Sequence, residues 1–284
     1  MDNNVFTVLP MSQTINLVAG ETYTGKITIV NPADATADFA YKVETTPYGV
    51  AGLDYTADLA TMTNRTQIAK WITIEEPTGT IKPNETKEVK YKIKVPENAP
   101  AGGQYAAITV TSDDKGEADN GVAVKNVFEM ASLVYANVAG ETEHDGQILE
   151  NSVPGFVVSQ PVTVTTKFSN NGNVHEIATI KLEVKDMFSD AVILPTEENE
   201  GTYSELIMPE TERLVTRDIT NLPALGMVKV TQTVYYNGES STTEQNVIIC
   251  PIWFMAIVAV TILAIVALVV RIILRHSKKK KASY

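Results

Sequence analysis

The three histidines are the residues of this sequence best suited to acid–base or metal chemistry, and they lie far apart at His144, His175 and His276. His175 is followed by Glu176, but this pair lacks the second histidine that would complete a zinc-binding helix. The sequence also contains no Gly-x-Ser-x-Gly nucleophile elbow and no phosphate-binding glycine loop. We therefore predict solvent-exposed loop histidines, no catalytic residues, no metal, no cofactor and no enzymatic activity.

A run of acidic residues invites a calcium-binding interpretation, because carboxylate oxygens are preferred calcium ligands. The run consists of Asp113, Asp114, Glu117 and Asp119. Its spacing does not match a helix–loop–helix calcium site, and carboxylates are common at hairpin tips. We therefore predict a solvated tip at residues 112–121.

Aromatic side chains could stack on sugar rings. Trp71 opens a predicted strand over residues 71–74, where a lone tryptophan usually belongs to a core. A sugar-stacking platform is the alternative. The other candidates for stacking are Tyr41, Tyr48, Tyr55, Tyr105, Tyr135, Tyr203, Tyr235 and Tyr236. The sequence does not indicate which of them face outward together.

Two further features are relevant to covalent attachment: a single cysteine and a segment similar to a sortase signal. Cys250 is the single cysteine, so no disulfide can form within the chain. An idle or buried thiol is predicted there, with an intermolecular disulfide as the alternative. The segment Leu194-Pro195-Thr196-Glu197-Glu198 is similar to a sortase signal, but it lacks the glycine and lies far from the apolar C-terminal segment. Attachment to a cell wall by sortase is therefore not expected.

The run from Ile252 to Val270 contains 19 residues and no charge. As a helix it is about 28 Å long, close to the ~30 Å hydrocarbon core of a bilayer. We predict a transmembrane helix over residues 252–274, since a buried core helix of this length with no polar face is rare. The residues expected to anchor its ends are Trp253, Phe254, Arg271, Arg275, Lys278, Lys279, Lys280 and Lys281.

The distribution of charge predicts the orientation of this helix. Six of the 23 Lys and Arg residues follow Pro251, where no acidic residue occurs, so residues 1–250 hold 17 basic against 34 acidic residues. Positive flanks stay cytoplasmic, which predicts extracellular N-terminal domains and a basic cytoplasmic tail at 275–284. Nucleic acid is excluded as a partner by the acidic outer part. This topology implies a cleaved signal peptide, and whether Met1 is native stays open.

Everything before Pro251 is predicted to form strands and turns, because no window of a dozen residues has a helical period. In the clearest strand, Val89–Val95, apolar residues alternate with three lysines, as one buried and one solvated sheet face require. The same pattern recurs at Lys26–Ile29, Gln104–Val110, Val162–Phe168, Thr179–Val184 and Val228–Val234.

Turn motifs separate these runs. Val18–Thr22 and Lys82–Thr86 each precede a strand, and Asn237-Gly238 supplies the two positive-φ positions of a type I′ hairpin turn. Short strands without intervening helices predict an all-β fold. The expected architecture is two antiparallel immunoglobulin-like β-sandwiches followed by one C-terminal transmembrane α-helix.

The boundary between the two sandwiches is predicted at the polar, glycine-containing stretch Ala139–Gly146. We expect the first sandwich over residues 1–140 and the second over residues 145–250. The segment Val122–Val138 is expected to be a long strand that pairs back on Gln104–Val110.

Several segments carry a resemblance to a known family. Phe6–Pro10, Gly52–Tyr55 and the block Trp71–Ile108 are similar to the first domain of the WxL-interacting surface proteins of Gram-positive bacteria. Phe168–His175 and Leu222–Gly226 resemble the bacterial immunoglobulin-like module that follows it. This resemblance implies that the first domain binds peptidoglycan, that the second binds a host or surface ligand, and that WxL-domain proteins are partners.

The sequence thus predicts a membrane-anchored binding or scaffold protein of the bacterial cell surface. Its predicted partners are the lipid bilayer, peptidoglycan, and WxL-domain or other surface proteins. The alternative is an envelope sensor or assembly factor that recognises a protein partner by sheet-edge pairing. No ligand-binding residue is assigned by either reading.

Overall fold

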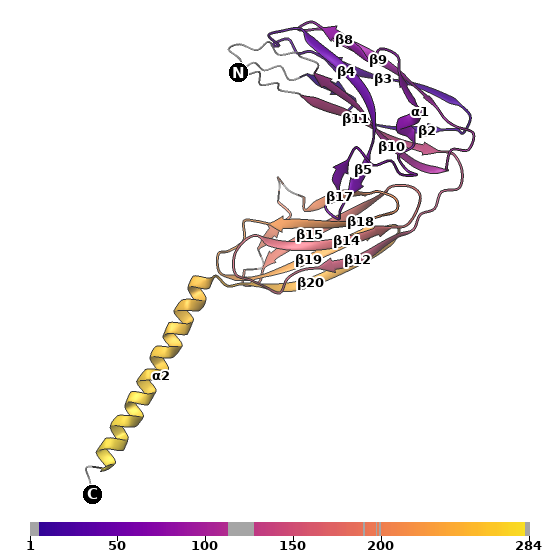
Figure 1. Ribbon diagram of the computed structural model, residues 1–284. Helices are drawn as coiled ribbons and strands as arrows, with labels where there is room; N and C mark the ends of the chain where they lie inside the picture. Colours follow the sequence, from indigo (N-terminus) through magenta and orange to yellow (C-terminus); the bar gives the residue numbers. More distant parts are fainter. Residues whose placement is uncertain (1–5, 113–127, 190, 197, 199, 282–284) are drawn as a thin grey trace. The chain divides into compact units, whose positions relative to one another are not determined.

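The computed structural model describes the backbone of residues 6–112, 128–189, 191–196, 198 and 200–281, and side chains up to residue 273 (Figure 1). The chain divides into two compact units. Unit 1 comprises residues 1–147, 168–177 and 206–213, and unit 2 comprises residues 148–167, 178–205 and 214–284. The acidic run at 113–119, nearly all of the predicted tip at 112–121 and the first part of the strand expected at 122–138 lie outside the described residues.

Two sheets enclose one apolar core in the first sandwich. The four-stranded sheet has the order β1 (Thr7–Leu9), β3 (Thr22–Val30), β9 (Thr86–Lys94) and β7 (Ile72–Ile74). The five-stranded sheet has the order β2 (Ser12–Leu17), β11 (Glu129–Val138), β10 (Gly102–Ser112), β4 (Phe39–Pro47) and β8 (Thr78–Ile81). A separate hairpin is formed by β5 (Gly49–Ala51) and β6 (Thr56–Asp58).

The alternation predicted for residues 89–95 is confirmed in β9. Val89, Tyr91 and Ile93 are fully buried in the core, and the intervening lysines are exposed. Because side chains of a strand alternate between its two faces, this pattern places one face of the sheet on the core and the other in water.

The alternation predicted for Gln104–Val110 is wrong. Every residue of this stretch in β10 is buried. The reason is its position: β10 lies between β11 and β4 inside the five-stranded sheet, and Tyr135 and His175 contact Tyr105 on its outer face. Tyr105 on that face is fully buried.

The prediction that no helix precedes Pro251 is also wrong. Residues Ile68–Trp71 form α1, a single turn whose Ile68 and Ala69 are buried. Trp71 therefore ends a helix and does not begin a strand, and the strand that follows is β7. Trp71 is half-buried and packs against the core, in agreement with the core interpretation.

The second sandwich also consists of two sheets. The smaller has the order β12 (Gly146–Ser152), β14 (Val162–Asn170) and β18 (Thr211–Ile219). The larger has the order β13 (Phe156–Val157), β20 (Glu239–Ile249), β19 (Gly226–Tyr236), β15 (Glu176–Asp186) and β16 (Val192–Leu194), with β17 (Thr202–Ile207) also on β15. As predicted, Ile180, Leu182 and Val184 point into its core.

The Asn-Gly hairpin turn is confirmed. Tyr236 pairs with Glu239 across it, and Asn237 and Gly238 have φ angles of 49° and 76°. Two strand pairs depart from the antiparallel arrangement, because β2 runs parallel to β11 and β13 runs parallel to β20.

The chain ends in α2 (Ile252–Lys281). Its stretch Ile252–Ile273 has a mean hydropathy of 3.0, and none of it is buried against the rest of the protein. Within the described residues this is the helix long and apolar enough to span a bilayer. The predicted fold class is confirmed as two immunoglobulin-like β-sandwiches and one C-terminal apolar helix.

Candidate functional site

The strand β2 forms one edge of the five-stranded sheet in unit 1. It pairs in parallel with β11, with Thr14 beside Tyr135 and Asn16 beside Asn137. On its other side no strand lies among the residues that the structure describes. Among the terminal strands of the two sheets of the first sandwich, β2 is the longest, with 6 residues against 4 for β8 and 3 each for β1 and β7.

The backbone of β2 presents hydrogen-bonding groups to its open side. The N–H groups of Leu133 and Ala139 in and after β11 donate to the carbonyls of Met11 (2.9 Å) and Leu17 (2.8 Å). Met11 and Leu17 are both odd-numbered, so the odd-numbered residues of β2 direct their backbone groups toward β11. Successive residues of a strand alternate in direction. The even-numbered residues Ser12, Thr14 and Asn16 therefore direct their N–H and C=O groups outward.

Natural proteins usually protect such an edge with charges, proline or a covering segment. The sequence Ser12–Leu17 contains neither a charged residue nor a proline. Ile15 and Leu17 fix the strand because they are buried in the core. At its two ends large apolar side chains are exposed: Met11 to 75%, and Leu9 and Val18 to 47% each. Among the described residues, this edge is thus anchored to the core on one face and carries no covering strand.

A groove of about 310 Å³ lies on the outer face of the sheet beside this edge. Its wall is formed by Thr14 and Asn16 of β2 and by Tyr135 and Asn137 of β11. The side-chain oxygen Oδ1 of Asn137 is buried and accepts no hydrogen bond from the described residues. A buried amide oxygen without a donor is costly, and this amide lies in the wall of the groove.

An aromatic cluster, made of Tyr48, Tyr105, Tyr135 and His175, adjoins the groove. The ring centroids of Tyr135 lie 6.0 Å from Tyr48, 5.9 Å from Tyr105 and 5.6 Å from His175. These distances and the tilted or edge-on angles are those of favourable aromatic packing. Three of the tyrosines considered for sugar stacking thus contact one another within the protein.

His175 is not a solvated loop residue, contrary to the prediction. Its backbone N–H donates to the hydroxyl of Tyr105 at 3.0 Å, and its Nδ1 lies 3.1 Å from the same oxygen. Burial lowers the pKa of His175, against the opposing effect of the Glu176 carboxylate. Burial likewise raises the pKa of Tyr105. Both groups are held neutral and serve packing. His144, in contrast, is exposed and pairs with Glu176.

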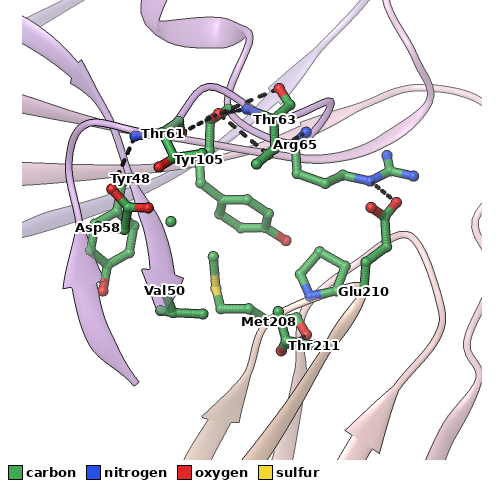
Figure 2. Close-up of a pocket in the computed structure, with 13 residues that line it drawn as sticks. Tyr48, Val50, Asp58, Thr61, Thr63, Arg65, Tyr105, Met208, Glu210 and Thr211 are labelled. Atoms are coloured by element: carbon green, nitrogen blue, oxygen red, sulfur yellow. Dashed lines mark hydrogen bonds and ion pairs between the residues drawn. The ribbon is translucent and has the colours of Figure 1, made fainter. Parts of the chain in front are cut away.

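A second cavity, of about 240 Å³, is lined in part by Tyr105 (Figure 2). Figure 2 shows Arg65 reaching across its rim to Glu210, with Nε and the carboxylate 2.8 Å apart. A second guanidinium nitrogen donates to the carbonyl of Ala101 at 3.0 Å. The cation of the cavity is therefore already neutralised, so the cavity offers no free charge for an anionic ligand.

Asp58 and Thr66, which also line this cavity, accept hydrogen bonds from backbone N–H groups. The carboxylate of Asp58 accepts the N–H groups of Ala60 (2.9 Å) and Thr61 (3.0 Å), and hydrogen bonds from Thr61 and Ala60 lower its pKa. Thr66 accepts the N–H of Thr63 at 2.7 Å.

Tyr55, at the tip of the β5–β6 hairpin, is also hydrogen-bonded within unit 1. Its hydroxyl accepts the N–H of Met208 at 3.0 Å and contacts Thr211, and the guanidinium of Arg213 lies 4.6 Å from its ring centre. Burial raises the pKa of Tyr55, and the hydrogen bond to Thr211 opposes that rise. This residue fastens the hairpin and presents no free ring.

The predicted anchor residues lie on α2. Trp253 and Phe254 are in its first turn with ring centroids 5.8 Å apart, and Arg271 is near the end of the apolar stretch. The backbone of Arg275 and Lys278–Lys281 continues the helix. Cys250, just before it, is half-buried and donates its N–H to the carbonyl of Val157 at 2.9 Å.

Comparisons with known proteins find fimbrial chaperones. No protein-family model matches the chain, and no curated protein sequence matches it. A chain of the Salmonella enterica SafA pilin–SafB chaperone complex has a TM-score of 0.41 at 9% identity, covering 86% of this chain and 96% of that one. The class 5 fimbriae chaperone CfaA has a TM-score of 0.41 at 12% sequence identity, and the match covers 85% of this chain and 99% of that one. A chain of the Acinetobacter baumannii CsuC–CsuE complex has a TM-score of 0.39 at 13% sequence identity, and the match covers 85% of this chain and 98% of that one.

These findings overturn the family assigned from sequence. The similar solved structures reported above come from fimbrial chaperone systems, and the assignment to the WxL-interacting proteins of Gram-positive bacteria is wrong. The peptidoglycan binding and the WxL-domain partners that it implied have no support either. The turn-and-strand motifs that suggested the family belong to the fold, because they mark hairpins and buried strands common to many sandwiches. The identities are too low to assign a role to any residue of this chain.

Proposed function

We propose that this chain is a membrane-tethered, non-catalytic assembly factor that binds an extended segment of a protein partner along the open edge of β2. The carrying observation is the outward direction of the backbone groups of Ser12, Thr14 and Asn16, next to no other described strand. A partner strand would form main-chain hydrogen bonds with these groups, which supply affinity without demanding a particular sequence.

The groove beside β2 adds selectivity to this binding. Side chains of an added strand alternate between the two faces of the sheet, so every second one lies over the outer face next to Thr14 and Asn16. There it meets Tyr135 and Asn137. We expect the preferred partner segment to place a polar side chain, such as an amide or hydroxyl, at that position, because Thr14, Asn16 and Asn137 line the groove with polar groups.

Tethering is the second part of the proposal. The apolar stretch Ile252–Ile273 has 22 residues and is about 33 Å long as a helix, enough to cross the ~30 Å hydrocarbon core. The basic residues 275–281 follow it and the aromatic pair Trp253–Phe254 precedes it. Both features support a single-pass orientation with residues 1–250 outside the cytoplasm and the tail inside.

A pair of substitutions at one position tests the binding edge. Thr14→Pro removes one outward N–H group from β2, whereas Thr14→Ala changes the side chain and keeps that group. The full chain in detergent, as wild type and both variants, is used to recover partners from the surface-protein extract of the cells that produce it. The recovered proteins are then identified by mass spectrometry.

We expect one defined protein to be recovered by the wild type and by Thr14→Ala, and its yield to fall about tenfold with Thr14→Pro. Thermal unfolding of the two variants should be the same, since proline is tolerated at a sheet edge. Equal recovery by both variants would show that the partner does not pair with β2.

A further inference from the structure

The end of the second sandwich from which α2 departs carries exposed apolar side chains. They are Phe156, Val158, Met187, Phe188 and Leu225, here called the apolar rim. Phe188 is exposed to 82%, and the others to between 40% and 50%. Single exposed apolar residues need no explanation, but several that share one end of a domain mark a surface for a partner.

Strand register places these five residues at one end. Phe156 pairs with Ile248 and Met227 also pairs with Ile248, close to the end of β20. The N–H of Met187 donates to the carbonyl of Met227 at 3.1 Å, which brings the turn holding Phe188 to the same level. Val158 and Leu225 directly adjoin these paired segments. All of them lie within unit 2.

The start of α2 is covalently close to this rim. Cys250 and Pro251 alone separate the last residue of β20 from the first residue of α2. Three peptide units span at most about 11 Å. The N–H groups of Phe254 (3.0 Å) and Met255 (3.1 Å) donate to the carbonyl of Pro251, so the helix already begins there. Little free chain is left to lift the sandwich away from a membrane that α2 crosses.

We infer that the apolar rim inserts into the lipid headgroup layer and seats unit 2 directly on the bilayer. The headgroup layer is about 5–7 Å thick on each side, comparable to the reach of the short connection. Apolar side chains at this depth gain by leaving water, and interfacial segments bury their apolar face about 5–10 Å into the boundary. This inference rests on the proposed membrane tether.

Hydrogen bonds to Asp186 hold the turn that carries Phe188. The carboxylate of Asp186 accepts the N–H groups of Phe188 (2.9 Å) and Ser189 (2.8 Å) and the Ser189 hydroxyl (2.9 Å). These bonds lower the pKa of Asp186 and hold its carboxylate in the turn. The ring of Phe188 is therefore presented by a hydrogen-bonded turn and not by a free loop.

Lipid quenching of tryptophan fluorescence tests the inference. The full chain is reconstituted into phosphatidylcholine vesicles that contain a lipid brominated near the top of the acyl chain. Two variants are compared in a Trp253→Phe background: Phe188→Trp at the rim, and Tyr235→Trp as a matched control. Tyr235 is 50% exposed and lies eight residues further along β19 than Met227, about 27 Å away from the rim. The native Trp71 is a constant background in both.

We expect quenching about threefold stronger for Phe188→Trp than for Tyr235→Trp, because only the former reaches the headgroup layer. Equal quenching of the two variants would overturn the inference. The wild-type chain gives an independent reading, since Trp253 lies on α2 itself. If Trp253 is quenched but Phe188→Trp is not, the seating of unit 2 on the bilayer is rejected and the tether stands. If Trp253 itself is not quenched, the membrane tether is rejected.

Discussion

The central strand β10 and the edge strand β2 belong to the same five-stranded sheet, but they differ in how fully the described neighbouring segments pair with their backbone and cover their side chains. In β10 both neighbouring strands are present, and even the outward-facing Tyr105 is buried against Tyr135 and hydrogen-bonded to His175. In β2 one side pairs with β11 and the other side has no described partner. The partner strand proposed above would supply for β2 the second neighbour that β10 already has among the described residues.

Substitutions at the two strands should therefore affect different properties, stability in one case and binding in the other. Changes around β10 should lower stability and reduce binding only through unfolding. Changes at the open side of β2 should reduce binding and leave stability unchanged.

Tyr105→Ala should destabilise unit 1 by about 3–5 kcal/mol, because it removes a fully buried aromatic ring from the cluster. Chemical denaturation of the full chain in detergent, followed by circular dichroism, measures this loss. Tyr105→Phe is the control that keeps the ring and removes the hydroxyl, and it should cost less. A full-sized loss for Tyr105→Phe would mean that the hydroxyl, not the packing, carries the stability.

Asn170→Ala should cost about 2–3 kcal/mol. The buried amide of Asn170 donates to the carbonyls of Val174 (2.9 Å) and Ile207 (3.1 Å) and accepts the N–H of Gly172 (3.0 Å). Alanine leaves these backbone groups without their partner. The neighbouring Asn171→Ala, at an exposed position, serves as control, and equal melting temperatures of the two variants would contradict this account.

Thr14→Pro should weaken partner binding about tenfold while it changes the free energy of unfolding little. This is the reverse of the result expected for Tyr105→Ala. Titration of the purified partner against both Thr14 variants measures the binding constants. Loss of stability parallel to the loss of binding would remove the distinction between the two strands.

His175 should make unit 1 less stable in mild acid. Burial lowers its pKa in the folded state below the ordinary 6.5. Well above pH 6.5 the imidazole is neutral in both states and nothing is lost. As the pH falls below 6.5, the unfolded chain binds a proton first, so stability decreases until the folded pKa is reached. The melting temperature of the wild type should fall more between pH 7 and pH 5 than that of His175→Gln, and parallel curves would contradict the prediction.

Glu210→Gln should have the smallest effect, between about 0 and 1 kcal/mol, although it breaks the ion pair with Arg65 that Figure 2 shows. Half of the Glu210 side chain is exposed, so solvent screens the pair. The exposed pair Lys26–Glu88 offers a control through Glu88→Gln. A distinctly larger loss at Glu210 would show that the second cavity has more than a structural role.

The parts of the fold that were predictable depend on local patterns. Period-two alternation identified β9 and β15, and Asn237-Gly238 fixed its hairpin by backbone conformation alone. The burial of β10 and of His175 was not predictable, because the segments that cover them come from distant parts of the sequence. Apolar alternation at Ile15 and Leu17 is too short to identify β2, and its position at a sheet edge follows from topology alone.

Hydrogen exchange resolved to single amides tests the central claim that a partner strand pairs with β2. The full chain in detergent is measured alone and with the protein recovered through the Thr14→Ala variant. Binding should slow the exchange of the outward amides of Thr14 and Asn16 by about tenfold and leave that of Ile15, which faces β11, unchanged. Binding that leaves Thr14 and Asn16 unprotected would contradict the claim.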